Sequence, residues 1–458
     1  MRKVLFVLLF VVLAVVMPAP AFMQDLPFTR SACANGVDLT GQIVSLYHIA
    51  NRNDQDDIFP ALQAGYADAA EYFNAHGGMC GATMAQVYDN KYVASNQDIY
   101  KRFVQLDPKP LAVTLYSSGD SAQLAPQLAK DEIPGLLLRG GSLESVYGED
   151  GQTPGWVFAT NPLYVDQVGS VCDYIVAHPE RFPKPVIGFV SNDDSWAKHV
   201  VEGSHPYCES LGIGYAGVGY FSDDTVTLAG VKKLIDAGAN TLYTNFLRGG
   251  PTGLTATLAN MNLQDKIAVA AVNGAMDADI YFLGDRSVGS DKLPYTNGMI
   301  GSLPLRSWAE VDNPGIQMIT QQADLHKRPF TMHDNAYVMG WAASDLFIET
   351  YIETGNRVGF EHITGADIKE TLEKIVYAPL GGVEQIDYQG GTRRALAANR
   401  IGEFHYLGKD GKNAADANNP PIINGIFMTP WIVPLTDYQP APDLRPGGAN
   451  VVEATPAT

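Results

Sequence analysis

The chain has 458 residues, with 31 Lys and Arg against 50 Asp and Glu, which gives a formal charge of −19. This balance argues against a nucleic-acid partner, which needs clustered basic residues, and it does not favour binding to an anionic membrane surface. A hydrophobic content of 46% with 45 Gly and 28 Pro fits a globular protein with many turns, long enough for two or three domains.

The first 21 residues have the three parts of an export signal. Arg2 and Lys3 are basic, Val4–Val16 is an uninterrupted apolar run, and Ala19-Pro20-Ala21 offers a small-residue cleavage site. An apolar run of this length is short for a membrane span, which needs roughly 20 residues. We therefore expect residues 1–21 to be a cleavable signal peptide and the mature chain to work in the periplasm or another extracytoplasmic compartment. An uncleaved anchor helix is the alternative.

Export changes the meaning of the four cysteines, because an even number of cysteines in an oxidising compartment indicates disulfides. Cys33 and Cys80 each precede one of the first two strands, and adjacent strands would bring them together. Cys172 and Cys208 lie on two successive helical segments. We favour these two pairs, Cys33–Cys80 and Cys172–Cys208. A zinc site is the alternative, but the chain has no CxxC pair to support it.

The first part of the mature chain alternates between apolar runs and amphipathic segments. Such alternation predicts βαβ units and a parallel sheet. The expected elements are a strand at Gln42–Ile49, a helix at Phe59–Ala75, a strand near Ala85–Tyr88, a helix at Asn96–Gln105, a strand at Leu111–Tyr116, a helix at Asp120–Lys130 and a strand at Gly135–Leu138.

The same alternation then begins again, which at this length indicates two α/β lobes. The second set comprises helix Asp166–Ala177, strand Val186–Val190, helix Trp196–Leu211, strand Gly214–Tyr220, helix Leu228–Ala237, strand Thr241–Thr244, helix Gly253–Met261 and strand Ile267–Ala271. Helices at Asn335–Glu353 and Gly365–Lys374 and a strand at Arg400–Tyr406 follow. Residues 436–458 are rich in Pro, Ala and Asp without periodicity, so we expect a disordered tail there.

Two short loops follow neighbouring strands of the first set: Ser117-Ser118-Gly119 and Gly140-Gly141-Ser142. Open α/β sheets bind ligands at the carboxyl ends of their strands, where helix N-termini and free backbone N–H groups converge. Small residues let a ligand carboxylate approach those donors closely. The two loops therefore predict a binding cleft that accepts an anionic group.

In its motifs the chain resembles exported solute-binding proteins of ATP-driven importers, of the leucine/isoleucine/valine-binding type, over roughly residues 38–435. Five segments in a fixed order carry the resemblance: Phe73-Asn74-Ala75-His76-Gly77-Gly78, Ser117-Ser118-Gly119, Ala125-Pro126, Ile133-Pro134 and Gly140-Gly141-Ser142. The resemblance implies an α/β chain with the type I periplasmic-binding-protein fold. In that fold two Rossmann-like lobes with parallel sheets are joined by a three-stranded hinge.

The resemblance also implies how the chain divides between the lobes. The N-terminal lobe would comprise residues 38–160 and 302–380, and the C-terminal lobe residues 161–301 and 381–435. Hinge crossings would then lie near Thr160, Gly301 and Leu380.

The family's ligand residues map onto nine positions, by resemblance alone. In the N-terminal lobe they are Ser117, Ser118, Gly140, Gly141 and Ser142, and in the C-terminal lobe Trp196, Phe246, Leu247 and Asn273. Asn273 stands where the family has an acid that pairs with the ligand ammonium, and an amide cannot neutralise a cation. Asp193 or Asp194 could compensate; otherwise an amide, or a carboxylate without an α-amino group, rivals an amino acid as the ligand.

By resemblance we expect a monomeric binding protein without enzymatic activity, cofactor or metal. It would capture a small polar solute (an amino acid, an amide or a related carboxylate) and deliver it to the membrane permease of an ABC transporter. One alternative is an exported α/β serine hydrolase acting through Ser118 or Ser121. Another is the ligand-sensing partner of a membrane receptor, which would share every residue named.

Overall fold

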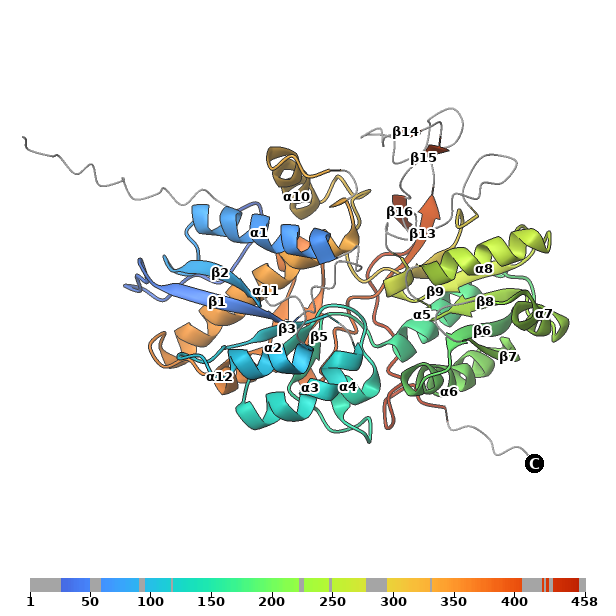
Figure 1. The fold of residues 1–458 in the computed structure, drawn as a ribbon, viewed down its shortest axis with the longest axis horizontal. Helices are drawn as coiled ribbons and strands as arrows, with labels where there is room; N and C mark the ends of the chain where they lie inside the picture. Colours follow the sequence, from blue (N-terminus) through green and yellow to red (C-terminus); the bar gives the residue numbers. More distant parts are fainter. Residues whose placement is uncertain are drawn as a thin grey trace, which may run out of the picture.

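The computed structural model describes residues 26–49, 59–89, 95–116, 118–221, 226–246, 249–276, 295–329, 332–405, 422–423, 426–427 and 431–452. Two β-sheets lie side by side, each with helices against it (Figure 1). The α/β class expected from the alternating sequence pattern is therefore confirmed. The predicted signal peptide, residues 1–21, lies outside the described residues.

The first sheet has five strands in the order β2-β1-β3-β4-β5, and all of its pairings are parallel. Its strands are β1 (Ile43–Ile49), β2 (Thr83–Tyr88), β3 (Val113–Leu115), β4 (Gly135–Leu137) and β5 (Val157–Ala159). The helices between them are α1 (Phe59–Ala75), α2 (Asn96–Phe103), α3 (Ser118–Asp131) and α4 (Leu143–Tyr147). Each strand is thus joined to the next strand of the chain by a helical crossover, as parallel pairing requires.

The second sheet has seven strands in the order β16-β13-β10-β9-β8-β6-β7. They are β6 (Val186–Asn192), β7 (Gly214–Phe221), β8 (Thr241–Thr244), β9 (Ala268–Ala271), β10 (Ile300–Ser302), β13 (Ile401–His405) and β16 (Trp431–Pro434). Helices α5 (Tyr164–Ala177), α6 (Ser195–Ser210), α7 (Leu228–Asp236) and α8 (Gly249–Asn260) accompany it. Pairing is parallel from β10 to β7, whereas β13 runs antiparallel to both of its neighbours, so this sheet is mixed.

After β10 the chain returns to the first sheet. It forms α10 (Pro314–Leu325), α11 (Asn335–Val358), α12 (Gly365–Leu372), β11 (Val376–Tyr377), α13 (Pro379–Gly382), β12 (Ile386–Asp387) and the 3-10 turn η3 (Gln389–Gly391). Another 3-10 turn, η1 (Asn273–Ala275), follows β9, and β14 (Ile422–Ile423) pairs with β15 (Ile426–Phe427). Tyr388, Ala395 and Ala398 pack in the hydrophobic core of the first sheet. Residues beyond the boundary expected at 380, up to 398, therefore pack against the first sheet.

Helix α11 packs along α1 at very short range. A Cβ atom on Gly65 would lie 2.2 Å from the Tyr337 carbonyl oxygen, and one on Gly340 would lie 2.7 Å from the Leu62 carbonyl oxygen. Glycine at these two positions is what lets the helix backbones approach each other. Most of α11 is buried as a result.

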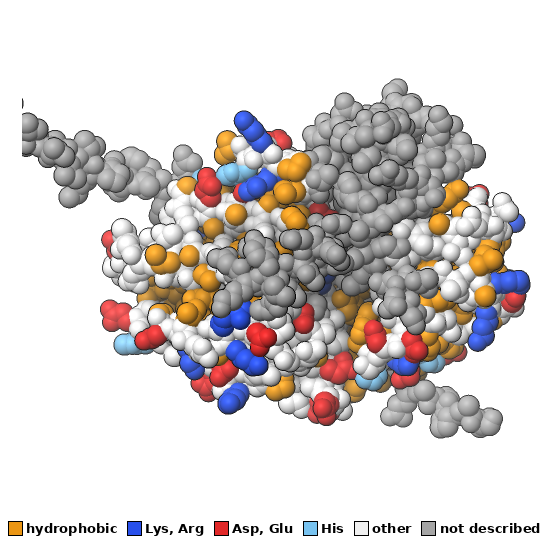
Figure 2. Space-filling view, viewed as in Figure 1, with side chains coloured by type: hydrophobic (Ala, Val, Ile, Leu, Met, Phe, Trp, Pro, Cys, Tyr) orange, Lys and Arg blue, Asp and Glu red, His pale blue; other side chains and the backbone are white. Residues whose placement is uncertain are grey.

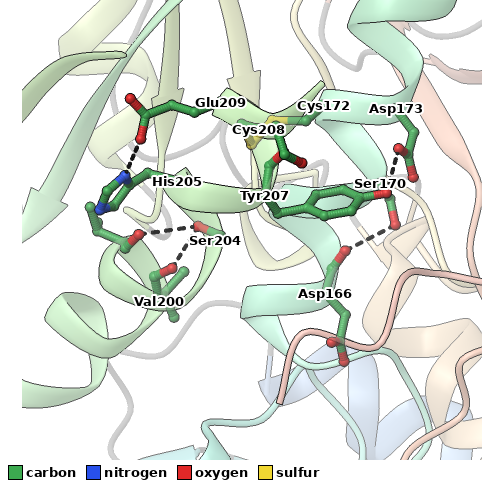
Figure 3. The surroundings of a disulfide bond; sticks show 12 residues. Asp166, Ser170, Cys172, Asp173, Val200, Ser204, His205, Tyr207, Cys208 and Glu209 are labelled. Atoms are coloured by element: carbon green, nitrogen blue, oxygen red, sulfur yellow. Dashed lines mark hydrogen bonds and ion pairs between the residues drawn. A yellow bond between two sulfur atoms is a disulfide. The ribbon is translucent and has the colours of Figure 1, made fainter. Parts of the chain in front are cut away.

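The cysteine pairs are those that the sequence analysis favoured. Cys33 is bonded to Cys80, and Cys172 is bonded to Cys208, which leaves no thiol to ligate zinc. The second bond joins α5 to α6, and the Tyr207 hydroxyl donates a 2.8 Å hydrogen bond to Asp173 beside it (Figure 3). Helices α5 and α6 are thus joined both by the disulfide and by this hydrogen bond.

Residues 435–452, named here the C-terminal strap, lie along the segment that precedes β13. The Gln439 N–H donates to the Asn399 carbonyl oxygen, and the Ala441 N–H donates to that of Leu396. Leu444 is 3% exposed and packs in a core beside β3, β4 and β5. The expectation of a disordered tail is wrong for residues 436–452, because neighbouring chain satisfies their backbone groups despite their aperiodic composition.

A buried ion-pair network ties the strap to both sheets. The Arg394 guanidinium donates to the Asp166 carboxylate at 2.7 Å and to the Tyr147 hydroxyl at 2.6 Å, and it also pairs with Asp443 of the strap. Asp166 also accepts a 3.0 Å hydrogen bond from the Leu444 N–H. The side chains of Arg394 and Asp166 are both fully buried.

The described surface carries charges of both signs. Acidic and basic side chains lie interspersed on the face drawn in Figure 2. Some form pairs within one helix, such as Lys232 with Asp236. Exposed pairs of this kind contribute little to stability, so the fold depends on its cores and buried networks. Among the described helices, none combines the length and apolar character needed to cross a membrane.

Replacing Arg394 by Met should destabilise the protein by about 3–5 kcal/mol, because the substitution leaves the Asp166 carboxylate buried without its cation. Urea unfolding measures the change. Arg181→Met is the matched control: Arg181 is one third exposed and pairs with Glu403, so little loss is expected. A loss of under 1 kcal/mol for Arg394→Met would contradict a structural role for the network.

Glu384 lies between α13 and β12, and its raised pKa leads us to predict that the free energy of unfolding depends on pH. Burial raises the pKa of Glu384 from 4.5 to about 8, although a hydrogen bond with Thr160 opposes the shift. Between these values the folded chain holds a proton that the unfolded chain has released. Stability therefore falls as pH rises from 5 to 8, by up to about 1.4 kcal/mol per pH unit from this group.

Glu384→Gln should remove that part of the slope in unfolding curves measured at pH 5, 6, 7 and 8. Glu361→Gln, at an exposed position, should leave the slope as in the wild type. Equal slopes for wild type and Glu384→Gln would show that Glu384 does not keep its proton.

Candidate functional site

Loops from the two sheets meet in one place. Gly141, Ser142 and Leu143, which follow β4, line a cavity of about 10 Å³ together with Trp196 and His199 of α6 and with Val165 and Val200. This volume is room for about one water molecule, so the loops are in close contact. His199 also pairs with Glu144 of α4. The carboxyl ends of β4 and β6 therefore face each other across a narrow gap.

Ser118 is the first residue of α3 and is half-buried. Its side chain lies close enough to the hydroxyl of Tyr164, the first residue of α5, to act on the pKa of that hydroxyl. Burial raises the pKa of Tyr164, while the positive charge of Arg139 and the contact with Ser118 oppose that rise. Ser118 therefore lies beside a residue from the other side of the gap. Ser117 lies outside the described residues.

The double glycine after β4 is covered by α5. A Cβ atom on Gly140 would lie 2.6 Å from Tyr164 Cε1 and 2.6 Å from Gln167 Nε2. One on Gly141 would lie 2.9 Å from the Leu137 side chain. The structure shows that glycine at position 140 makes room for the Tyr164 ring. That these glycines let a ligand approach stays a prediction.

Ser142 precedes α4 and is 5% exposed. Its hydroxyl makes no capping hydrogen bond to that helix, although its carbonyl oxygen accepts a 2.7 Å bond from Ser145. A helix N-cap usually explains a serine at such a position. That explanation does not apply to the Ser142 hydroxyl, which is consistent with the expected role in ligand contact.

Trp196 is the second residue of α6 and lines the small cavity between the two sheets. Its ring is 5.2 Å from the Tyr164 ring, centroid to centroid, and it lines the small cavity with Ser142. Two aromatic rings at this distance form an apolar wall. Trp196 thus lies in the first turn of a helix, next to the loop of the first lobe, and its contact with a ligand stays a prediction.

The segment after β8 differs from the expectation. Phe246 is fully buried and packs against Phe221 at 6.0 Å in the core of the second sheet, and Leu247 lies outside the described residues. The neighbouring Asn245 is also fully buried; its amide donates 3.0 Å to the Ser191 hydroxyl, and its Oδ1 has no hydrogen-bond partner among the described residues. An apolar residue at a strand end packs inward more readily than it faces a polar ligand.

Asn273 begins η1 and is 7% exposed. Its N–H donates 2.9 Å to Gln167 Oε1, while its side-chain Oδ1 has no hydrogen-bond partner within the described part of the chain. The Gln167 amide in turn donates 2.8 Å to the Pro162 carbonyl oxygen. Gln167 thus ties the Asn273 loop to the segment that joins the two sheets.

The two aspartates that could have replaced a missing acid are committed to other contacts. Asp193 pairs with Lys198 at 2.6 Å, and Asp194 Oδ1 accepts the Ala197 N–H at 3.0 Å as the cap of α6. Asp193 is exposed. Neither supplies a free carboxylate opposite Asn273.

Three residues that the sequence analysis did not select belong to this place. Tyr164 and Gln167 lie on either side of Asp166, where the sequence predicted the start of a helix. Arg139 directly follows the predicted strand Gly135–Leu138. Arg139 is 4% exposed, and its guanidinium carbon lies 5.2 Å from the centroid of the Tyr116 ring. A charged residue between a buried strand and two glycines is the signal that could have marked it.

A larger pocket than this cavity lies elsewhere among the described residues. It has a volume of about 280 Å³ and is lined by Asn240, Thr241 and Lys266, among other residues at the amino ends of β8, β9 and β10. Ligands of open α/β sheets bind at the carboxyl ends of the strands. We therefore take the gap between the two sheets as the candidate site, despite its small volume in this closed arrangement.

Comparisons with known proteins place these features in context. The model of a protein family described as periplasmic binding protein matches residues 54–403. A branched-chain amino acid ABC transporter protein from Thermus thermophilus, with bound valine, superposes with a TM-score of 0.68 at 18% identity, covering 88% of this chain and 98% of that one. No curated protein gives a significant sequence match.

Other solved structures of the same fold hold different ligands. An ABC transporter solute-binding protein from R. palustris in complex with 4-hydroxybenzoate gives a TM-score of 0.65 at 13% identity. One from Rhodopseudomonas palustris BisB5 in complex with 3,4-dihydroxybenzoic acid gives 0.63 at 11% identity. Each covers 88% of this chain and 98% of its own. Identities this low establish the shared fold and leave the ligand open.

Gly140→Ala should destabilise the protein by about 1–3 kcal/mol, because the added methyl group overlaps Tyr164 and Gln167. Urea unfolding measures the loss. Gly119→Ala is the matched control, since no atom lies within 4 Å of its added Cβ and alanine favours the helix in which it sits. Equal stability of the two variants would mean that α5 does not press on the double glycine.

Proposed function

This chain belongs to the periplasmic binding protein family, and on that premise we propose that it is the solute-binding component of an ABC importer. It captures a small polar solute between its two lobes, outside the cytoplasm, and presents the closed complex to a membrane permease. The solved structures with the same fold include ABC transporter proteins that hold valine or hydroxybenzoates. That range supports the role and leaves the solute to be determined.

The observation that carries this proposal is the contact between the two lobes. Ser118 of the first lobe lies beside Tyr164 of the second, and Trp196 and His199 of α6 line one small cavity with Gly141 and Ser142 of the loop that follows β4. Polar groups from both sheets thus converge in a place that closes fully when the lobes approach. Hinge closure around a ligand excludes water and strengthens each hydrogen bond inside.

Closure also explains how a permease recognises the loaded protein. A ligand that binds the closed form better shifts the population toward it, and the closed form presents a different surface from the open one. We propose the segments at 160–163, 303–306 and 392–400 as the hinge, because they connect residues packed on one sheet to strands or helices of the other. The loaded protein would then be a monomer that meets the permease with both lobes.

The hydrolase alternative has less support. Ser121 lies inside α3 and is fully buried, so no substrate reaches it in this arrangement. Ser118 lies beside the Tyr164 hydroxyl, whose pKa burial raises, and such a group is a poor general base at neutral pH. We therefore propose a protein without enzymatic activity.

The proposal is tested by identifying, with mass spectrometry, the small molecule retained by natively purified protein. Calorimetry then measures its rebinding after the ligand has been removed by partial unfolding. Small-angle scattering should show a smaller radius of gyration with ligand than without. A protein that retains nothing, does not contract with any small solute and hydrolyses esters would refute a transport role.

Ser118→Ala should weaken binding of the retained molecule about three- to tenfold, the range expected for one lost hydrogen bond. Ser210→Ala, at an exposed position far along α6, should bind as the wild type does. Unchanged affinity in Ser118→Ala would remove Ser118 from the site.

A further inference from the structure

The C-terminal strap, residues 435–452, connects the two lobes once more, beside the segments proposed as the hinge. It begins at the end of β16, an edge strand of the second sheet. Its far end lies against the first lobe: the Arg445 guanidinium carbon is 4.9 Å from the centroid of the Tyr147 ring of α4. A Cβ atom on Gly151, in the loop between α4 and β5, would lie 3.0 Å from Pro446. In Figure 1 the red end of the described chain passes between the two lobes.

The middle of the strap has a sequence suited to pairing on one side only. Residues 439–442 read Gln-Pro-Ala-Pro. The Gln439 N–H donates to the Asn399 carbonyl oxygen at 3.0 Å. The Ala441 N–H donates to the Leu396 carbonyl oxygen at 2.9 Å, whereas the two prolines have no N–H to donate. Proline is tolerated on an edge strand where its nitrogen faces away from the partner. The alternation therefore fastens a stiff strap along the third hinge segment.

The tip of the strap, residues 443–450, is a loop closed by its own hydrogen bonds. The Asp443 N–H donates to Asn450 Oδ1, and the Asn450 N–H donates to the Asp443 carbonyl oxygen, both at 3.1 Å. The Gly448 N–H donates to the Arg445 carbonyl oxygen at 2.7 Å. A closed loop of this kind presents its side chains in fixed positions, which a flexible tail does not.

This tip is bonded to both lobes at once. On the second lobe, the Leu444 N–H donates to Asp166 Oδ1 of α5 at 3.0 Å, and a Cβ atom on Gly169 of the same helix would lie 2.9 Å from the Leu444 side chain. On the first lobe, Asp443 pairs with Arg394, whose segment is bridged to β5. Leu444 also packs in the core beside β3, β4 and β5. Moving α5 away from the first sheet would therefore expose Leu444 and break its bond to Asp166 or the pair between Asp443 and Arg394.

We propose that the C-terminal strap is a fourth connection between the lobes and that it limits how far they separate. The inference rests on the proposed function, because only lobes that move need such a limit. Hinge segments bend because a few residues absorb the change in backbone angles. A strap that is bonded along one hinge segment, with its tip bonded to both lobes, resists this bending. The open form is thereby kept close to the closed one, which lowers the conformational cost of binding.

Double electron–electron resonance measures the separation of the lobes directly. Lys130→Cys on α3 and Lys233→Cys on α7 place one spin label on each lobe at exposed positions, and the native cysteines are all in disulfides. The full chain is compared with a chain that ends at Leu435, after the retained molecule has been removed from both. We expect the shortened chain to have a broader distance distribution, with a mean longer by more than about 2 Å, the scale of a domain rearrangement.

Asp443→Asn keeps the whole strap and weakens only the attachment of its tip, so it tests the inference even where the shortened chain does not fold. Its distance distribution should broaden in the same direction, by less than in the shortened chain. Asp437→Asn is the matched control, because Asp437 lies at an exposed position earlier in the strap and should keep the wild-type distribution. Circular dichroism confirms that each variant is folded.

A wild-type distance distribution in the folded shortened chain, or in Asp443→Asn, would overturn the inference. The proposed function is judged separately, by adding the retained molecule back to the full chain. A distance that then shortens supports lobe closure, whatever the strap does. A distance that stays the same in every variant, with and without that molecule, would overturn both the inference and the proposed closure.

Discussion

The buried Arg394 network is the interaction on which the arrangement of this molecule depends. It joins four segments: α4 through Tyr147, α5 through Asp166, the C-terminal strap through Asp443, and the segment before β13 through Arg394 itself. Helix α4 and the segment that bears Arg394 pack with the first sheet, and α5 is the first helix of the second lobe. Burying charge costs free energy that the pair recovers only with good geometry and further hydrogen bonds. The network therefore specifies where these segments meet more than it adds to stability.

The geometry of the candidate site depends on where the Arg394 network holds α5. Asp166 and Gln167 are adjacent residues of α5, and Tyr164 is two residues before Asp166. When Arg394 holds Asp166, the same turn of helix places Tyr164 over Gly140 and directs Gln167 toward Asn273. A residue outside the cleft thus fixes the side chains that close it. The absence of a Cβ at Gly140 is the complementary requirement, because any larger residue would displace the Tyr164 ring.

Much of the fold could be predicted from the sequence, because its elements are bounded by strong local signals. The strand expected at Gly135–Leu138 and the helix expected at Phe59–Ala75 lie where the apolar spacing and the glycines put them. The cysteine pairs followed from the order of the elements. What failed depends on tertiary contact. The C-terminal strap has no periodicity of its own and is ordered by hydrogen bonds to residues 396–401.

The site was predictable in outline, because the ends of parallel strands must meet at one edge. Its detail was not. Phe246 turned inward because the second core had room for its ring, and Tyr164 entered the gap because α5 starts two residues earlier than the helix spacing indicated. Arg139 stands between an apolar strand and two glycines, but only the three-dimensional neighbourhood shows that its charge reaches Tyr164.

The net charge of the whole chain affects the rate at which a charged solute approaches, whereas the contacts inside the cleft set the strength of binding. A formal charge of −19 repels an anionic solute at long range. At physiological ionic strength that field decays within about 8 Å, whereas a buried guanidinium is screened much less. An anion would thus gain no electrostatic acceleration on approach and would be attracted only within the closing cleft. Selection by the groups of the cleft would then act on the lifetime of the closed complex, which is the state that a permease has to recognise.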